Sequence, residues 1–345
     1  MEKYEKGDKL GEGAWGVVTS ATLKSTGQLV AIKKIAMKSG KYTEGANFTA
    51  LREIKLLKEL KHENIIELVD VFLVHEDLNL VFEFCETDLE TILMEQRVVL
   101  KPEHIKCHML MMLKGMAFLH ENFILHRDMK PNNLLYSSGG VLKLADFGLA
   151  RQYGSPGRLM TQSVVTRWYR PPELCFGCRE YGAAVDMWAV LLLQVGCIFA
   201  ELMCRRPLFP GASDVDQVAR IFQIMGTPTK ENWPDHCSLP DYIEFQPQKP
   251  IDLATLLSAA SPDAMDLLTK LLVLRPDARA SAAEALQHPY FTSELPPPCD
   301  PSALDLPVPE ERKKKFQPNK ADGKGAGVPL ATKTFTPRAI IPARG

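Results

Sequence analysis

Three glycines near the N-terminus constrain the fold of this chain more than any other short segment. The segment GEGAWG, residues 11–16, has the spacing G-x-G-x-x-G, which in a dinucleotide-binding fold leads straight into a helix. Here the residues that follow are VVTSA, which favour a strand because they are β-branched or small. The sequence therefore predicts a glycine-rich flap between two strands, whose backbone can lie close over phosphate groups because no Cβ intervenes.

The residues around this flap predict a β-rich N-terminal part, residues 1–85. The polar turn KSTGQ, residues 24–28, joins two strand-like runs, and LNLVFEF, residues 78–84, is a further strand. One helix, Phe48–Leu60, is expected to have its apolar residues on a single face: Leu51, Ile54, Leu57 and Leu60.

Helical patterns dominate the second part, residues 86–291. HIKCHMLMMLKGMAFLHEN, residues 104–122, is apolar on most sides and predicts a buried helix. A small β-rich lobe beside a larger helical lobe predicts a ligand-binding cleft between them. The remaining residues, 292–345, hold ten of the 25 prolines and few aromatic residues, which favours a disordered tail.

Composition excludes several other classes of protein. The net charge of −1 does not favour direct nucleic-acid binding by the whole chain. The longest apolar run, Met187–Ala200, is too short for a bilayer and suits a buried core helix. The 8 cysteines have no regular spacing and no apolar segment follows Met1, which indicates free thiols in a reducing compartment. Cys175 and Cys178 form a C-x-x-C, but without a second pair a zinc site is not favoured.

Polar residues that suit phosphate chemistry follow the flap. Lys33, in VAIK, lies 17 residues after Gly16, where a hairpin would direct its charge into the cleft towards phosphates. It needs a counter-charge, and Glu53 on the next helix is the best candidate.

The segment HRDMKPNN, residues 126–133, places three more polar side chains on one rigid loop. Asp128 can orient a hydroxyl and accept its proton, and Lys130 can neutralise a moving phosphoryl group. Asn133 and Asp146, the latter in ADFG, offer oxygen ligands for Mg²⁺. His126 is expected to be a packing histidine.

These motifs occur in the order GEGAWG, VAIK, HRDMKPNN, DFG and PPE between Tyr4 and Phe291, and over this range the sequence resembles a eukaryotic protein kinase. The resemblance implies an α+β bilobal fold and Ser/Thr phosphorylation with ATP and Mg²⁺. NFTALRE, LVFEFCETDLE, HRDMKPNNLL and GTPTKENWPD are most similar to the cyclin-dependent kinases, in their CDK-activating branch.

The branch implies partners, substrates and a location. A cyclin, of the H type, would bind the Phe48–Leu60 helix and press Glu53 towards Lys33. A RING-finger assembly factor and transcription factor IIH are further partners by resemblance. The substrates would be activation loops of other cyclin-dependent kinases and the RNA polymerase II repeat, with a proline after the target residue. Localisation in the nucleus is expected, with the cytoplasm as a second location, and RKKK, residues 312–315, is either a nuclear import signal or a solvated run of charges.

The resemblance also implies roles for individual residues. Phe82 would close the back of the nucleotide site, the backbone of Glu83 and Cys85 would bind adenine, and Asp88 would reach the ribose. The other ATP contacts would come from Leu10, Gly11, Glu12, Gly13, Gly16, Val18, Ala31, Lys33 and Leu135. Ser155 and Thr161 would be phosphorylated, with Arg52, Arg127 and Arg151 around the phosphate, and Val165 and Arg170 would shape the substrate-proline pocket.

Two departures from the family stand out. Pro171 replaces the usual alanine before Pro172, which restricts Arg170. About five residues, Leu191–Val195, are inserted in the predicted core helix. Five extra residues rotate one half of this helix against the other by ~140° and lengthen it by ~7.5 Å. We expect the helix to bulge or lengthen, and the protein to be less stable or less active than one without the insert. Asp186, which anchors the HRD backbone in the family, lies upstream of the insert.

Two alternatives remain open. One is a cell-cycle cyclin-dependent kinase that acts on other substrates. The other is a scaffold that binds cyclin without catalysis, which only the insertion favours.

Overall fold

The structure, a computed structural model, describes residues 3–13, 16–35, 44–75, 77–152, 166–178, 184–304 and 306–307. They belong to one unit, Met1–Val308. The predictions for Ser155, Thr161 and Val165 lie outside these residues.

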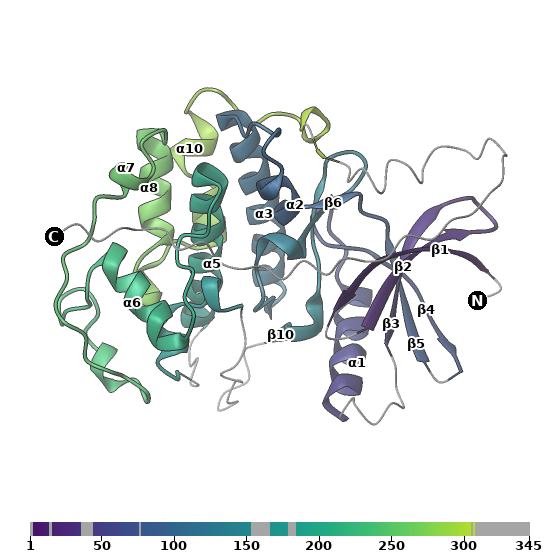
Figure 1. The fold of residues 1–345 in the computed structure, drawn as a ribbon, viewed down its shortest axis with the longest axis horizontal. Coiled ribbons are helices and arrows are strands. Elements are labelled where there is room, and N and C mark those ends of the chain that lie inside the picture. Colours follow the sequence, from purple (N-terminus) through teal and green to yellow (C-terminus); the bar gives the residue numbers. More distant parts are fainter. Residues whose placement is uncertain are drawn as a thin grey trace, which may run out of the picture. The chain divides into compact units, whose positions relative to one another are not determined.

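The N-terminal lobe is built on one antiparallel sheet (Figure 1). Its five strands, in the order β1-β2-β3-β5-β4, are β1 (Tyr4–Gly13), β2 (Gly16–Leu23), β3 (Leu29–Ile35), β4 (Leu68–Val74) and β5 (Asp77–Glu83). The predicted turn joins β2 to β3, and Gly27 there has φ +74°, which a residue without Cβ adopts easily. The sequence did not single out β4, an edge strand.

The one helix of this lobe, α1 (Glu44–Glu59), confirms the predicted helix but not its predicted face. Ala50, Glu53, Leu56 and Leu57 are buried, whereas Leu51 is 54% exposed. A repeat of three residues loses ~60° per step against the helical turn, so four residues at that spacing spread over half the helix surface. The prediction that Leu51 shares one face with Leu57 and Leu60 is therefore wrong.

The C-terminal lobe is mostly helical, with short strands near its junction with the sheet (Figure 1). The strands are β6 (Thr87–Asp88), β7 (Ile124–Leu125), β8 (Leu134–Tyr136), β9 (Leu142–Leu144) and β10 (Arg151–Gln152). The helices are α2 (Leu89–Met94), α3 (Pro102–Glu121), α4 (Pro172–Cys175), α5 (Ala184–Cys204), α6 (Asp214–Met225), α7 (Leu253–Leu256), α8 (Pro262–Leu271), α9 (Ala282–Leu286) and α10 (Pro289–Thr292). The expected buried helix is α3, in which Met109, Leu113 and Met116 have no exposed surface.

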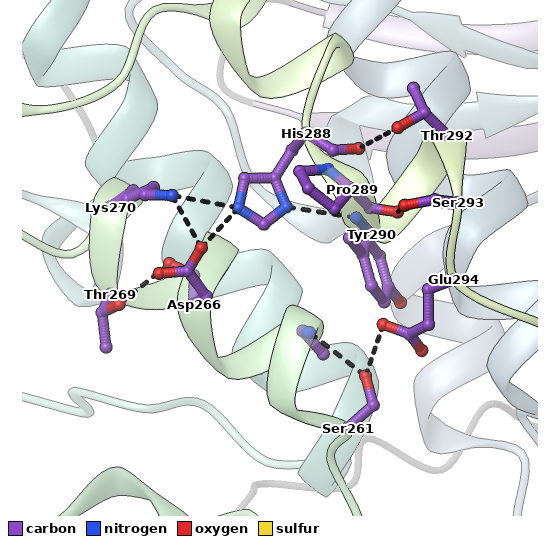
Figure 2. Close-up of polar contacts among 11 residues, drawn as sticks. Ser261, Asp266, Thr269, Lys270, His288, Pro289, Tyr290, Thr292, Ser293 and Glu294 are labelled. Atoms are coloured by element: carbon purple, nitrogen blue, oxygen red, sulfur yellow. Dashed lines mark hydrogen bonds and ion pairs between the residues drawn. The ribbon is translucent and has the colours of Figure 1, made fainter.

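Polar side chains connect α8 to the C-terminal end of the lobe, in addition to apolar contacts (Figure 2). Asp266 on α8 accepts hydrogen bonds from Lys270 at 2.6 Å and from Nε2 of His288 at 2.8 Å. The other ring nitrogen of His288 accepts from the backbone N–H of Tyr290 at 3.2 Å and caps α10. Ser261, which caps α8, donates to Glu294 at 2.8 Å. The start and the middle of α8 are therefore connected to Glu294, which lies after α10, and to the start of α10.

The predicted disorder of residues 292–345 does not hold for residues 292–304. The buried ammonium group of Lys106 on α3 donates to the backbone oxygens of Glu294 and Pro296 at 2.9 and 2.8 Å. The N–H of Cys299 donates to the oxygen of Glu103 at 3.2 Å. Proline richness indicates that a segment lacks regular structure, but it does not prevent its carbonyl groups from binding a helix.

Helix α5 absorbs the inserted residues by lengthening. It runs without interruption over 21 residues, and Leu192, Leu193, Gln194 and Val195 have no exposed surface. Of the two outcomes predicted for the insert, a bulge or a longer helix, the structure shows the second. Within the described residues, no helix is both long and apolar enough to cross a membrane.

The C-terminal half of α5 is fixed by contacts with other segments. A Cβ added to Gly196 would lie 2.8 Å from Cδ2 of Leu272, so α5 closely approaches the C-terminal end of α8 there. Glu201 accepts a hydrogen bond from the hydroxyl group of Tyr169 at 2.7 Å. Arg205 donates to the backbone oxygens of Leu93 and Glu95 at 2.9 and 2.7 Å, which ties α5 to the end of α2.

Burial raises the pKa of the Glu201 carboxyl to about 7, against the hydrogen bond from Tyr169, which lowers it. In the unfolded chain the carboxyl ionises near its ordinary pKa of 4.5. Between these pH values the folded protein binds the extra proton, so stability falls as pH rises from about 4.5 to 7. We expect Glu201→Gln, which cannot ionise, to gain stability relative to the parent between pH 5 and pH 8, by on the order of 3 kcal/mol. Urea unfolding of both proteins at pH 5 and pH 8 checks this. The same difference in free energy of unfolding between variant and parent at both pH values would contradict it.

Deletion of residues 191–195 is expected to raise the melting temperature by a few degrees. The deletion removes the acceptor of the Met129 N–H, but it also removes the side-chain nitrogen of Gln194, which is buried without a hydrogen-bond partner among the described residues and costs about 1–3 kcal/mol. It further removes five residues that a closely packed core has to accommodate, and we expect the two gains to exceed the loss. Thermal denaturation of the parent and the deletion variant measures the change. A melting temperature at or below that of the parent would count against the prediction.

Candidate active site

The glycine-rich flap forms as predicted, between β1 and β2. Gly11 pairs with Val18 and Gly13 with Gly16. Gly16 has φ +137°, and an added Cβ would lie 1.9 Å from the backbone oxygen of Lys34, so the hairpin itself requires glycine there. Around Gly11 an added Cβ would meet nothing within 4 Å. Leu10 and Glu12 lie beside Gly11 on β1, and Glu12 pairs with Lys9 at the surface.

Lys33 on β3 reaches two carboxylates. Its ammonium group lies 3.0 Å from Oε2 of Glu53 on α1 and 3.5 Å from Oδ1 of Asp146. Burial alone would lower the pKa of Lys33, but the charges of Glu53 and Asp146 outweigh it and raise the pKa above its usual value. The lysine therefore stays charged at neutral pH. The pair with Glu53 is already formed in the chain by itself, so the expectation that a cyclin must first bring these two side chains together is not met.

Asp128 is held by three neighbours on or near its own loop. Lys130 lies 2.7 Å from Oδ2, and the hydroxyl group of Thr166 donates to Oδ1 at 3.0 Å. The side-chain nitrogen of Asn133 donates to Oδ2 at 3.1 Å. Burial would raise the pKa of Asp128, but the hydrogen bond and charge of Lys130, with Thr166, hold it below its usual range. Asp128 is therefore a carboxylate at neutral pH, able to accept a hydrogen bond from a hydroxyl group.

The backbone brings Asn133 and Asp146 to the same place, although 13 residues separate them. β8 pairs with β9 through Leu134 and Leu144, and the N–H of Ala145 donates to the oxygen of Asn133 at 2.9 Å. His126 is fully buried and binds the oxygen of Ala145 through Nε2 at 2.8 Å, which confirms it as a packing residue. Asp146 then leaves β9 in the left-handed region, with φ +61°.

The oxygen atoms at this point fit a hard cation. Oδ1 of Asp146 is buried and has no hydrogen-bond partner among the described residues, with only Lys33 at 3.5 Å. Asn133 uses its side-chain nitrogen for Asp128, which leaves its oxygen as the group for a ligand. No cluster of three His, Cys, Asp or Glu that could hold a metal occurs in the described ranges. Magnesium commonly takes only one or two protein ligands and completes its shell with phosphate oxygens and water.

The predicted adenine-binding residues lie on adjoining strands. Ala31 on β3 pairs with Phe82 on β5, and Leu135 on β8 pairs with Asp88 on β6. The carboxylate of Asp88 accepts from the N–H and the hydroxyl group of Thr91 at 2.8 and 3.0 Å, so it caps α2. The ribose contact predicted for Asp88 would have to share these oxygens.

Glu83 and Cys85 follow Phe82 at the end of β5. The side chain of Glu83 binds the ammonium group of Lys143 at 3.0 Å and the N–H of Glu67 at 2.8 Å. Both contacts use Oε1, and the backbone N–H of Glu83 donates to the oxygen of Glu67 at 3.1 Å. The backbone contact of Glu83 with adenine stays a prediction. Cys85 is partly buried.

The structure places part of the predicted phosphate pocket. Arg127 has φ +65° and donates through Nε to the oxygen of Leu149 at 2.7 Å. Arg151 on β10 pairs with Leu125, two residues before Arg127. Arg52 lies on α1 beside Glu53. The role of these arginines stays a prediction, because Ser155 and Thr161 lie outside the described residues.

The predicted substrate pocket is described only in part. Arg170 binds Oδ1 of Asp214, in the first turn of α6, at 2.8 Å. Its ψ of 124° is extended, as the following Pro171 requires. The proline at 171 therefore fits the local backbone, and Val165 lies outside the described residues.

Sequence reasoning missed Thr166, Glu201 and Gln194. Thr166 binds Asp128 over a separation of 38 residues, and Gln194 accepts from the N–H of Met129 at 3.1 Å over 65 residues. No local spacing marks either contact. The one available signal for Gln194 and Glu201 was polarity within an otherwise apolar helix, since such groups need a partner when buried.

Comparison with known proteins agrees with this geometry. The family model of the protein kinase domain matches residues 4–291. Cyclin-dependent kinase D-1 of Oryza sativa subsp. japonica is 54% identical over 309 residues, which cover 90% of this chain and 71% of that protein. Cyclin-dependent kinase 7 of Xenopus laevis is 52% identical, with 89% and 86% covered.

A solved structure, that of the CAK complex from Chaetomium thermophilum bound to ATP-gamma-S, has a chain that superposes with a TM-score of 0.81 at 42% identity. The superposition covers 88% of this chain and 94% of that one. The predicted bilobal fold is thereby confirmed. The chain belongs to the protein kinase family and, within it, to the cyclin-dependent kinases of the CDK-activating branch.

Proposed function

We propose that this chain is the catalytic subunit of a cyclin-dependent Ser/Thr kinase. It transfers the γ-phosphoryl group of ATP to activation loops of other cyclin-dependent kinases and to the RNA polymerase II repeat. The observation that carries the proposal is the convergence of Asp128, Asn133, Asp146 and Lys33, with charges fixed as phosphoryl transfer needs. The similarity to the CAK complex bound to ATP-gamma-S supports both the nucleotide and the branch.

The roles follow from the contacts. Asp128, ionised and held by Thr166, orients the hydroxyl group of the substrate and accepts its proton as the oxygen bonds to the γ-phosphorus. The bond from this phosphorus to the bridging oxygen breaks, and ADP leaves with that oxygen. Lys130, 2.7 Å from Asp128, also offers a positive charge to the transferring phosphoryl group. Lys33 binds the phosphates of ATP. Asn133 and Asp146 would hold Mg²⁺, which when bound offsets negative charge on the phosphate oxygens.

A cyclin is the proposed partner of α1. Leu51 on this helix is 54% exposed, although the opposite side, with Leu56 and Leu57, is buried. One exposed leucine does not by itself mark a protein contact, so the cyclin partner is inferred from the branch, and Leu51 is the apolar side chain of α1 that it would cover. Since the Lys33–Glu53 pair is present already, the cyclin would keep α1 in place rather than create the pair. A cyclin of the H type, a RING-finger factor and transcription factor IIH fit the branch, as does the nucleus.

Asp128→Asn tests catalysis against the scaffold alternative. The amide keeps the shape and can still accept from Thr166, but it cannot take a proton. We expect phosphate transfer to fall by about 10²–10⁴-fold, with a melting temperature within a few degrees of the parent and unchanged cyclin binding. Transfer of ³²P from ATP to a polymerase-repeat peptide and to an activation-loop peptide measures both proposed substrates.

The control for this test is Asp241→Asn at an exposed position. It should retain parental activity. No activity in the parent would favour the scaffold, whereas activity on neither of the two peptides but on other proteins would favour the cell-cycle alternative.

The flap offers a matched pair of variants. Gly11→Ala has room for its Cβ, so we expect an unchanged or slightly raised melting temperature but a KM for ATP raised several-fold, because the methyl group crowds the phosphates. Gly16→Ala meets the oxygen of Lys34 and should lower the melting temperature. Steady-state kinetics and thermal denaturation of both variants check this. An unchanged KM for ATP in Gly11→Ala would show that the flap does not cover the phosphates.

A further inference from the structure

The inserted residues bring a polar side chain to the catalytic loop. Gln194 is fully buried on α5, and its Oε1 accepts a hydrogen bond from the backbone N–H of Met129 at 3.1 Å. Met129 lies between Asp128 and Lys130. Because the N–H of Met129 can only donate, the atom that faces it must be the amide oxygen rather than the nitrogen.

We infer that Gln194, a residue of the insert, is a positioning residue that fixes the catalytic loop through the N–H of Met129. Met129 is fully buried, so water cannot replace this bond without opening the core. The neighbouring N–H, that of Asp128, binds Nδ1 of His126 at 3.3 Å within the loop itself. Gln194 thus supplies a contact between the catalytic loop and the buried helix α5, directly beside Asp128, whose carboxylate accepts the proton.

The geometry of α5 explains why a residue of the insert takes this place. Contacts of Gly196, Glu201 and Arg205 fix the C-terminal half of the helix. Gln194 and Glu201 are seven residues apart, about two turns, so they lie on the same face, which also meets Tyr169. Asp186 lies eight residues before Gln194, ~12 Å away along the axis and rotated by ~80°. The two positions therefore lie at different levels and on different faces of α5.

The bond is retained at a cost. The nitrogen of the Gln194 side chain is buried and has no hydrogen-bond partner among the residues the structure describes. If packing alone decided this position, an apolar residue such as the adjacent Leu192 or Leu193 would fill it without that cost. The oxygen of Gln194 is therefore the part of the side chain that the catalytic loop uses.

Hydrogen exchange of the full chain tests the contact without reference to activity. Gln194→Met keeps the size of the side chain but removes the acceptor, so the N–H of Met129 should exchange about 5- to 10-fold faster. The N–H of Asn133, which donates to the oxygen of Lys130 inside the loop, is the internal reference and should change little. Leu193→Met is the matched control in the same helix. Equal exchange at Met129 in Gln194→Met and Leu193→Met would overturn the inference.

Kinetics of the same variants, with the copurifying cyclin, separate positioning from folding. This arm rests on the proposed function. We expect kcat of Gln194→Met, per nucleotide-binding site titrated with a fluorescent ATP analogue, to fall about tenfold, with KM for ATP within twofold. Gln194→Glu restores an acceptor and should recover most of kcat and the slow exchange of Met129.

The two arms fail in different ways. If the total activity of Gln194→Met falls only because fewer sites bind the nucleotide, with kcat per titrated site unchanged, Gln194 supports the fold alone. That result would overturn the positioning role. A parent without kinase activity would refute the proposed function but leave the exchange result to decide on the contact. If Gln194→Glu does not fold, Gln194→Met against Leu193→Met still decides both.

Discussion

The active site depends on one peptide unit, that of Ala145. Its N–H donates to the backbone oxygen of Asn133, and its own oxygen accepts from His126. These two bonds connect the loop that carries Asp128 to the segment between the end of β9 and Asp146. Both lie in the core, where a backbone group without a partner would cost several times the net value of a hydrogen bond. Buried hydrogen bonds to this one peptide unit thereby help to set the positions of Asp128, Asn133 and Asp146.

Each of three carboxylates at the active site, those of Glu53, Asp128 and Asp146, has a lysine near it. Lys33 lies between Glu53 and Asp146, and Lys130 lies against Asp128. Removing one lysine would leave a partly buried carboxylate uncompensated, which costs more than the pair contributes. Glu201 is the contrast: it has a hydroxyl partner, not a cation, and burial raises its pKa to about 7. Within the C-terminal lobe, Lys130 therefore helps to hold the pKa of Asp128 below its usual range, whereas burial without a cation raises that of Glu201.

The sequence predicts what is local and misses what is distant. The flap, the β2–β3 hairpin and the roles of Lys33, Glu53 and Asn133 follow from spacing, β-branching and the chemistry of each side chain, together with family resemblance. Leu51 was placed on the wrong face because a repeat of three does not match the helical turn of 3.6 residues. The contacts of Thr166 with Asp128, and of Lys106 with residues 294–296, join segments 38 or more residues apart, and no pattern within either segment encodes the partner.

Helix α5 shows how an insertion can be tolerated by a closely packed core. Downstream of the insert, the close approach of Gly196 to Leu272 and the bonds of Glu201 and Arg205 leave no freedom to rotate. The ~140° rotation expected from five extra residues therefore falls on the upstream half of the helix. Leu192, Leu193 and Val195 suit a core by composition alone, but the loop also presents an N–H group that needs an acceptor. A glutamine among apolar residues meets that need, because its flexible side chain reaches the N–H of Met129 without a formal charge in the core.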